Sequence, residues 1–399
     1  MKRDGEGRRK VEKLRQGAVG DVRFRLLGGD GEPIEEVEAF MGYLSARGCS
    51  PNTLSAYVYD LLHFYRFLAE KELGWEDFTP ELSLEFLEYL RKTPSRNGGA
   101  RRLRPALVVD EGNPDDLSPT TRLSAETVNR TIAAVSSFYD YLIVSGLSDA
   151  HANPIRKKAD PALSRVSERP KPFLSGISRS TTVRRIARVK TVVRVPRPMP
   201  AEHVKMLLGS LKKLRDKAMV LLMVQGGLRP GEVLNLRLED VEYGRRRVTI
   251  RHREDHPKGV RTKSRTERVV DLHEPEALAA LNAYVMGERP LEAQSPFLFL
   301  VGGKGERRLE PLSYAALVKL FARRCEALGI RGPWVTPHAL RHTHATRMWE
   351  GGMRELALQK RLGHASPEST RIYTRVSDRA VAEEYHRALG AERGEETSR

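Results

Sequence analysis

The stretch TPHALRHTHATRMWEGGMRELALQKRLGHASPESTRIY, residues 336 to 373, decides how the C-terminal half of the chain folds. It begins with Thr336 and Pro337, a pair typical of a helix start, because threonine can cap exposed N–H groups and proline fits the first helical position. A Gly-Gly pair and a Gly-His pair each end a helix, and Ser366-Pro367 opens another. The stretch therefore predicts three short helices in succession.

Four side chains of these helices point to one kind of chemistry: His338, Arg341, His364 and Tyr373. His338 and Arg341 are three residues apart, which places them on one face of a helix. An arginine fork matches two phosphate oxygens, and imidazoles can donate to the same oxygens or move a proton. The cluster predicts phosphoryl transfer to a phenol without a metal or another cofactor.

The order H-x-x-R, then L-G-H, then a tyrosine nine residues later resembles the signature of the tyrosine recombinase (phage integrase) family. The resemblance implies that Tyr373 attacks a DNA phosphodiester and forms a 3′-phosphotyrosine, while Arg341, His338 and His364 bind the phosphate or move a proton. It also implies the fold, which is mainly α. A small antiparallel β-sheet belongs to the C-terminal catalytic domain, and the N-terminal domain is an all-α core-binding (SAM-like) bundle.

A second motif lies upstream, at residues 226 to 232, which read GGLRPGE. Pro230 suits the first turn of a helix, so Arg229 lies at the positive end of the helix dipole, where an anion is favoured. The G-x-R-x-x-E pattern resembles the first catalytic arginine of the family. The resemblance places Glu232 in the position of the acidic residue that supports the site.

A hairpin is expected between these two motifs, with strands at Arg247 to Arg251 and Arg268 to Leu272. The loop between the strands contains Lys258 and Lys263. The resemblance implies that a lysine on this hairpin donates a proton to the leaving oxygen. The order T-K-S-R-T-E-R-V-V favours Lys263, which precedes the returning strand, and Lys258 is the alternative.

Composition limits the partners of the chain. Its 399 residues carry a formal net charge of +17, which favours nucleic acid as partner, with an anionic membrane surface second. No apolar run is long enough to span a bilayer, and the N-terminus has no secretion signal. Cys49 and Cys325 fall in different expected domains, so we expect free thiols in a reducing compartment, the cytoplasm.

The spacing of apolar residues, and the Gly and Pro residues that interrupt it, divide the chain into four parts. Helical stripes predict a four-helix bundle before residue 155 and a second helical domain after residue 199. The expected parts are a disordered basic leader (1–32), a core-binding domain that clamps DNA (33–155, with an insertion at 94–122), a basic linker (156–198), and a catalytic domain with a C-terminal tail helix (199–399).

Two segments are strongly basic and are expected to contact DNA phosphates. The linker carries 13 Lys or Arg against Asp160 and Glu168, a net charge of +11. The simpler interpretation is a flexible tether between the domains. Our hypothesis is instead that the linker lies along the phosphate backbone of a DNA duplex. The expected contact residues are Arg184, Arg185 and Arg188 in the linker, Arg101, Arg102 and Arg104 in the insertion, and Lys258 in the hairpin loop.

The expected partner is double-stranded DNA, bound by two copies of the chain per site and four copies in the synapse. We expect the tail helix to dock on a neighbouring subunit. Two other functions use some of the same features. A type IB topoisomerase has similar chemistry, and a non-catalytic DNA-binding protein would explain the charge and the bundle but not the motif residues.

A metal site is the competing interpretation of the histidines. His338, His342 and His344 are close in sequence, and His252 could face His256. On a helix, however, side chains two residues apart point about 160° away from each other. No acidic or cysteine residues surround His342 and His344, so the sequence disfavours a metal.

Overall fold

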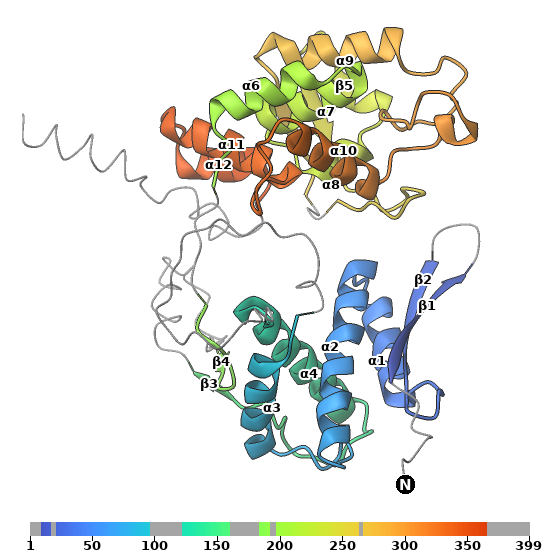
Figure 1. Cartoon of the computed structure of the whole chain (residues 1–399), viewed down its shortest axis with the longest axis vertical. Helices are drawn as coiled ribbons and strands as arrows, with labels where there is room; N and C mark the ends of the chain where they lie inside the picture. The colour runs from blue at the N-terminus through green and yellow to red at the C-terminus, as the bar shows by residue number, and fades with distance from the viewer. Residues whose placement is uncertain are drawn as a thin grey trace, which may run out of the picture. The chain divides into compact units, whose positions relative to one another are not determined.

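The computed structural model describes most of the chain as two compact units, which divide between Val193 and Arg194 and are treated separately below (Figure 1). The division falls inside the predicted linker. No described helix is both long and apolar enough to cross a membrane. The described residues are 9–16, 21–95, 122–159, 183–191, 197–262 and 266–364.

The N-terminal unit is built on four helices: α1 (Glu35–Ala46), α2 (Pro51–Glu70), α3 (Pro80–Lys92) and α4 (Ala125–Val144). The apolar stripes of the sequence form its core, in which aromatic rings contact one another across the helices. Ser50 and Ser124 cap α2 and α4, because each side-chain oxygen accepts the N–H three residues later, at 3.2 Å. The predicted four-helix bundle is confirmed.

The N-terminal segment differs from its prediction. We expected residues 1–32 to be a disordered leader, but the structure pairs β1 (Lys10–Gln16) with β2 (Asp21–Leu27) as an antiparallel hairpin. Leu26 is buried in the core of the unit, and Val11 and Phe24 pack against it. A strand that covers a core needs only every second residue to be apolar, so the many charges concealed this pattern.

Two described parts of the predicted linker, residues 156–159 and 183–191, belong to the N-terminal unit. Strands β3 (Lys157–Ala159) and β4 (Val183–Arg185) pair with each other, and Ala187 is buried in the helical core. The side-chain amide of Asn129 donates to the Val189 carbonyl at 2.9 Å and its oxygen accepts the Val189 N–H at 2.8 Å. These contacts disfavour the flexible-tether alternative for residues 157–159 and 183–189, whereas the hypothesis that the linker lies along a DNA duplex stays a prediction.

The C-terminal unit surrounds α7, whose side chains from Arg215 to Gln225 are buried except for the exposed Lys217. Helices α9 and α11 pack against it, and a three-stranded antiparallel sheet in the order β5-β6-β7 lies beside α12. The elements are α6 (Ala201–Ser210), α7 (Leu214–Gln225), α8 (Pro230–Asn235), η3 (Leu238–Asp240), β5 (Val241–Glu242), β6 (Arg247–Ile250), β7 (Arg268–Asp271), α9 (Pro275–Gly287), η4 (Glu306–Leu309), α10 (Tyr314–Ala327), α11 (Pro337–Glu350) and α12 (Glu355–Leu362).

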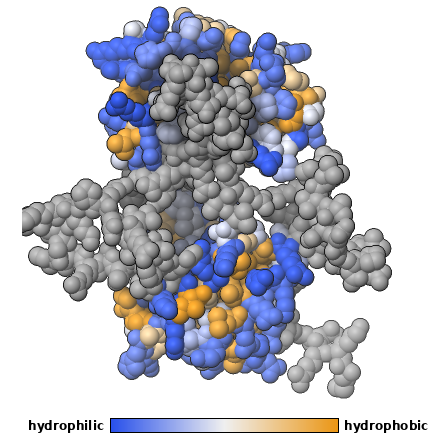
Figure 2. All heavy atoms as spheres, turned by 90° about the vertical axis from the view of Figure 1, so that its left-hand side faces the viewer, coloured by the Kyte–Doolittle hydropathy of each residue, from blue (hydrophilic) through white to orange (hydrophobic). Residues whose placement is uncertain are grey.

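The expected fold class, mainly helical with a small antiparallel sheet, is confirmed. The two hairpin strands form within one residue of their predicted ends, whereas α9 and β5 were not anticipated. On the face that Figure 2 shows, hydrophilic residues cover most of the visible part of the C-terminal unit, and apolar residues occur in separate small groups. Its buried apolar side chains gather instead in a large internal cluster around α7 and in a smaller one formed by Ala345, Leu358 and Leu362.

Candidate active site

The site begins where α8 starts. Pro230 occupies the first turn, as predicted, and Arg229 is the residue just before it, with an extended backbone. The carboxylate of Glu232 accepts the backbone N–H of Arg229 at 2.8 Å and its guanidinium Nη1–H at 2.7 Å. The helix start therefore fixes both the main chain and the side chain of this arginine on one carboxylate.

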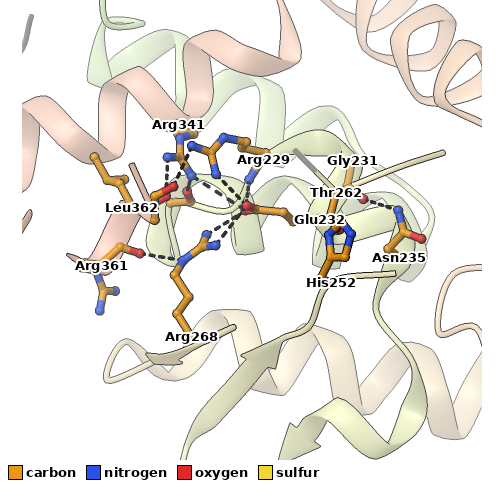
Figure 3. A network of polar contacts seen from close by, with 12 residues as sticks. Arg229, Gly231, Glu232, Asn235, His252, Thr262, Arg268, Arg341, Arg361 and Leu362 are labelled. Atoms are coloured by element: carbon orange, nitrogen blue, oxygen red, sulfur yellow. Dashed lines mark hydrogen bonds and ion pairs between the residues drawn. The ribbon is translucent and has the colours of Figure 1, made fainter. Parts of the chain in front are cut away.

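Glu232 is buried and contacts two further arginines (Figure 3). Arg268 on β7 donates from Nη1 and Nη2 to both carboxylate oxygens, at 3.0 and 2.7 Å, and Arg341 on α11 lies 3.8 Å away. Burial alone would raise the pKa of Glu232, but the hydrogen bonds and charge of Arg268, with the charges of Arg341 and Arg229, lower it to about 2. Three guanidiniums against one carboxylate leave two positive charges in excess.

Arg341 is 2% exposed, which is unusual for an arginine. It donates to the carbonyl of Gly227, before α8, at 2.6 Å and to the carbonyl of Leu362, at the end of α12, at 2.5 Å. Arg229 donates to the next carbonyl, that of the capping residue Gly363 just after α12, at 3.1 Å. The last carbonyls of a helix have no partner within it, so these arginines satisfy them and join α12 to the cluster.

His364 follows α12 directly and is half-buried. Burial lowers its pKa, and the charges of Arg341, Arg229 and Arg268 lower it further, to about 3. The imidazole is therefore neutral at pH 7, with one nitrogen that donates and one that accepts. The structure thus brings together four of the predicted site residues: Arg229, Glu232, Arg341 and His364.

His338 lies in the first turn of α11, and its ring centroid is 6.3 Å from that of His342, one turn further on. Burial lowers the pKa of His342 to about 4, and the nearby His338 and Arg341 act in the same direction. Thr336 precedes the helix as predicted, although its side chain makes no capping hydrogen bond. Both imidazoles are half-buried on the helix that carries Arg341.

His344 has a role that the sequence did not reveal. It is 1% exposed; its Nδ1 lies 2.9 Å from the Val224 carbonyl oxygen and its Nε2 accepts from Arg361 Nε at 3.0 Å. Burial, and then the charge of Arg361, lower its pKa to about 3, so the neutral ring donates from Nδ1. A Cβ on Gly227, which has φ of 67°, would lie 2.4 Å from this ring. Within the described residues no group of His, Cys, Asp and Glu side chains could hold a metal.

Asn235, the last residue of α8, contacts the hairpin loop. Its amide donates to the carbonyl of Val260 at 3.3 Å and to that of Gly231 at 2.9 Å, so the arm that leads toward Lys263 lies against the helix. Lys263 itself lies outside the described residues. The alternative, Lys258, forms an ion pair with Glu310 at 2.5 Å.

Other predicted residues fall outside the part of the chain that the structure describes. These are Tyr373, the tail helix, and the insertion residues Arg101, Arg102 and Arg104. Arg184 lies in β4, and Arg185 and Arg188 are half-buried on the N-terminal unit.

Arg268 is the residue of the cluster that the sequence analysis missed. A signal was present, because the strand R-V-V-D alternates between buried and exposed positions and Arg268 is in phase with the buried Val270. An arginine on the buried face of a strand needs an anionic partner inside the fold. Nothing in the local sequence names Glu232 as that partner.

Two family descriptions match the chain. One, "Phage integrase family", covers residues 197–380, and the other, "Phage integrase, N-terminal SAM-like domain", covers residues 37–107. Transposase A from transposon Tn554 of Staphylococcus aureus is 29% identical over 367 residues, which span 92% of this chain and 94% of that protein. Tyrosine recombinase XerC of Herpetosiphon aurantiacus is 28% identical over 353 residues, 87% of this chain and 92% of that protein.

Solved structures share the fold. The Tn1549 transposon integrase in complex with transposon right end DNA matches with a TM-score of 0.57 and 18% identity, over 88% of this chain and 98% of that one. XerH site-specific recombinase bound to a palindromic difH substrate matches with a TM-score of 0.56 and 19% identity, over 85% and 81%.

Proposed function

Because the chain belongs to the phage integrase family of tyrosine recombinases, we propose that it is a site-specific recombinase that cleaves and rejoins DNA through a tyrosine. One observation carries this proposal, namely the two excess positive charges around Glu232. A phosphodiester has one negative charge and its pentavalent transition state has two. The cluster therefore matches the transition state better than the substrate, as catalysis requires.

Each described residue of the cluster has a distinct task in this proposal. Arg229 and Arg341 donate hydrogen bonds to the non-bridging oxygens, whose charge grows in the transition state. Glu232 orients both guanidiniums, and the neutral His364 donates a further hydrogen bond to the phosphate. The arginines enter from α8 and α11, so two rigid helices set their spacing.

The covalent step uses Tyr373. Its phenol oxygen forms a bond to phosphorus as the bond to the 5′ oxygen breaks, the phenol proton passes to His338, and Lys263 protonates the leaving oxygen. A tyrosine pKa of about 10 makes a free phenolate at pH 7 cost about 4 kcal/mol, which favours concerted proton transfer. The phosphotyrosine ester conserves the bond energy, so rejoining needs neither ATP nor a metal.

DNA is the partner in this function, and the cytoplasm is its location. Two copies bind each site and four form the synapse. The N-terminal unit and the basic segment after it grip the duplex, with Arg185 and Arg188 available for phosphates near the end of β4. The relationship to transposon proteins makes integration or excision of a mobile element the most direct role.

Covalent trapping tests the proposal. A suicide DNA substrate, from which the cleaved strand is lost by diffusion, should give a protein–DNA adduct that Tyr373→Phe abolishes and that Tyr385→Phe, its matched control, retains. Strand exchange between two duplexes then separates a recombinase from a type IB topoisomerase. If the unaltered protein binds DNA and never forms an adduct, it is a non-catalytic binding protein.

A further inference from the structure

The guanidinium of Arg268 donates hydrogen bonds to other groups of the protein. Nη1 and Nη2 donate to the two oxygens of Glu232, and Nε donates to the carbonyl of Arg361 at 2.9 Å, in the last turn of α12 (Figure 3). Its side chain is 6% exposed. It enters the cluster from β7, on the side of Glu232 that Arg229 does not occupy.

Three consecutive carbonyls at the end of α12 are satisfied by three arginines from three other elements. Arg268 takes that of residue 361, Arg341 that of residue 362, and Arg229 that of residue 363. Contact is close at this end, because a Cβ on Gly363, which is left-handed with φ of 62°, would lie 2.7 Å from Arg268 Nη1. His364 follows immediately, so the position of Arg268 bears on this predicted site residue.

The charged and titratable groups that act on Glu232 come from α8, β7, α11 and the end of α12. Arg229 approaches from α8, Arg268 from β7, Arg341 from α11, and the neutral His364 from the end of α12. Burial favours the protonated carboxyl, and among the opposing groups Arg268 acts most strongly to keep it ionised. A protonated Glu232 would lose its attraction for the two other arginines.

We propose that Arg268 is a positioning residue for the recombination reaction, which keeps Glu232 ionised and fixes the end of α12 so that Arg229 and Arg341 meet the phosphate in register. This inference rests on the proposed function. Arg268 itself does not touch the substrate. It acts through the carboxylate of Glu232, which orients Arg229 and Arg341, and through the end of α12, which precedes His364.

Arg268→Lys is the deciding variant, because it retains the charge but cannot donate to both carboxylate oxygens and to the helix carbonyl together. We expect the single-turnover rate of adduct formation at saturating DNA to fall about 100-fold, as misplacement of catalytic groups by about 1 Å does. DNA affinity should stay within about threefold, because the loss falls on the transition state. As the pH is lowered, Arg268→Met should lose cleavage activity at a higher pH than the unaltered protein does, because Glu232 then protonates more readily.

Arg247→Met is the matched control. Arg247 lies in the same sheet and forms a two-bond ion pair with Glu242, at 3.0 and 2.9 Å. A residue that only stabilises the sheet would lower the folded fraction and leave the rate per folded molecule and its pH profile unchanged. We expect this behaviour of Arg247→Met.

An Arg268→Lys protein that forms the adduct at the normal rate with the normal pH profile would overturn the inference, whether or not Arg268→Met folds. Failure of the proposed function gives a different result, in which even the unaltered protein forms no adduct on the suicide substrate. Folding of each variant is checked by circular dichroism before the rates are compared.

Discussion

Asp60 in the N-terminal unit and Glu232 in the C-terminal unit are both buried carboxylates, each 1% exposed. Asp60 accepts two hydrogen bonds from Arg130, at 2.9 and 3.0 Å, and one from Thr131 at 2.7 Å. One guanidinium therefore balances one carboxylate. Around Glu232 three guanidiniums face a single carboxylate, and two charges remain.

The difference separates an ion pair that joins two helices from a cluster with excess positive charge, which we propose to be a binding site for an anion. Arg130 keeps 48% of its side chain exposed, so water shares its charge. Arg341 is almost fully buried, and an unbalanced charge in such a place is costly unless an anion completes it. The excess therefore predicts a ligand at Glu232 and none at Asp60.

The largest expected effect comes from removing each carboxylate in turn. Glu232→Gln leaves three guanidiniums without a counter-charge inside the protein and should lower the free energy of unfolding of the C-terminal unit by about 3–5 kcal/mol. Asp60→Asn should cost the N-terminal unit about 1–2 kcal/mol, because the freed Arg130 can be hydrated. Urea unfolding followed by tryptophan fluorescence measures both.

The three tryptophans make this measurement specific to each unit. Trp75 lies in the N-terminal unit, whereas Trp334 and Trp349 lie in the C-terminal unit, so a Trp75→Phe background reports on the C-terminal unit alone. A double Trp334→Phe, Trp349→Phe background reports on the other. If Glu232→Gln and Asp60→Asn lowered the free energy of unfolding of their units equally, the proposed difference between the Glu232 cluster and the Asp60–Arg130 pair would be wrong.

The next-largest expected effect is a loss of stability at low pH, which should begin in the C-terminal unit. Burial is the main reason why the pKa values of His256 and His342 are lowered to about 4 and those of His344 and His364 to about 3. Unfolding returns each to about 6.5, so the unfolded state binds more protons and stability falls as pH drops below about 6.5. Each histidine contributes at most about 1.4 kcal/mol per pH unit.

Glu232 adds a later loss, between its unfolded pKa of about 4.5 and its folded pKa of about 2, because folding keeps it ionised. Urea midpoints measured from pH 8 to pH 4 in the Trp75→Phe background should therefore fall steeply. His344→Gln should flatten this slope. A midpoint independent of pH over the range would contradict the neutral state of the buried histidines.

The smallest expected effect is stabilisation by a simple anion. Sulfate or phosphate at about ten times its Kd should add about 1.4 kcal/mol to the C-terminal unit through mass action. The matched measurement uses sodium chloride at equal ionic strength. The stabilisation should disappear in Arg341→Met and should be absent from the N-terminal unit; a similar gain in both units would mean that the anion acts on the whole surface.

Local sequence was sufficient for the elements that carry the motifs. Pro230 and Pro337 mark helix starts because proline lacks the N–H that a first turn does not use, and both helices begin where predicted. Gly363 ends α12 with a left-handed residue, as expected of a glycine after a helix. The hairpin β1–β2 was missed because its alternation has only a few apolar residues among charges.

The sequence by itself determined which residues we propose for the chemistry, because H-x-x-R, L-G-H and G-x-R-x-x-E are defined by spacing along the chain. Only the tertiary structure decided what holds them in register. Arg268 is 36 residues from Glu232, and Arg361 is 93 residues from Arg268, so no local pattern could pair them. Burial makes the pairing obligatory, since each charge removed from water must find a partner wherever the fold brings one.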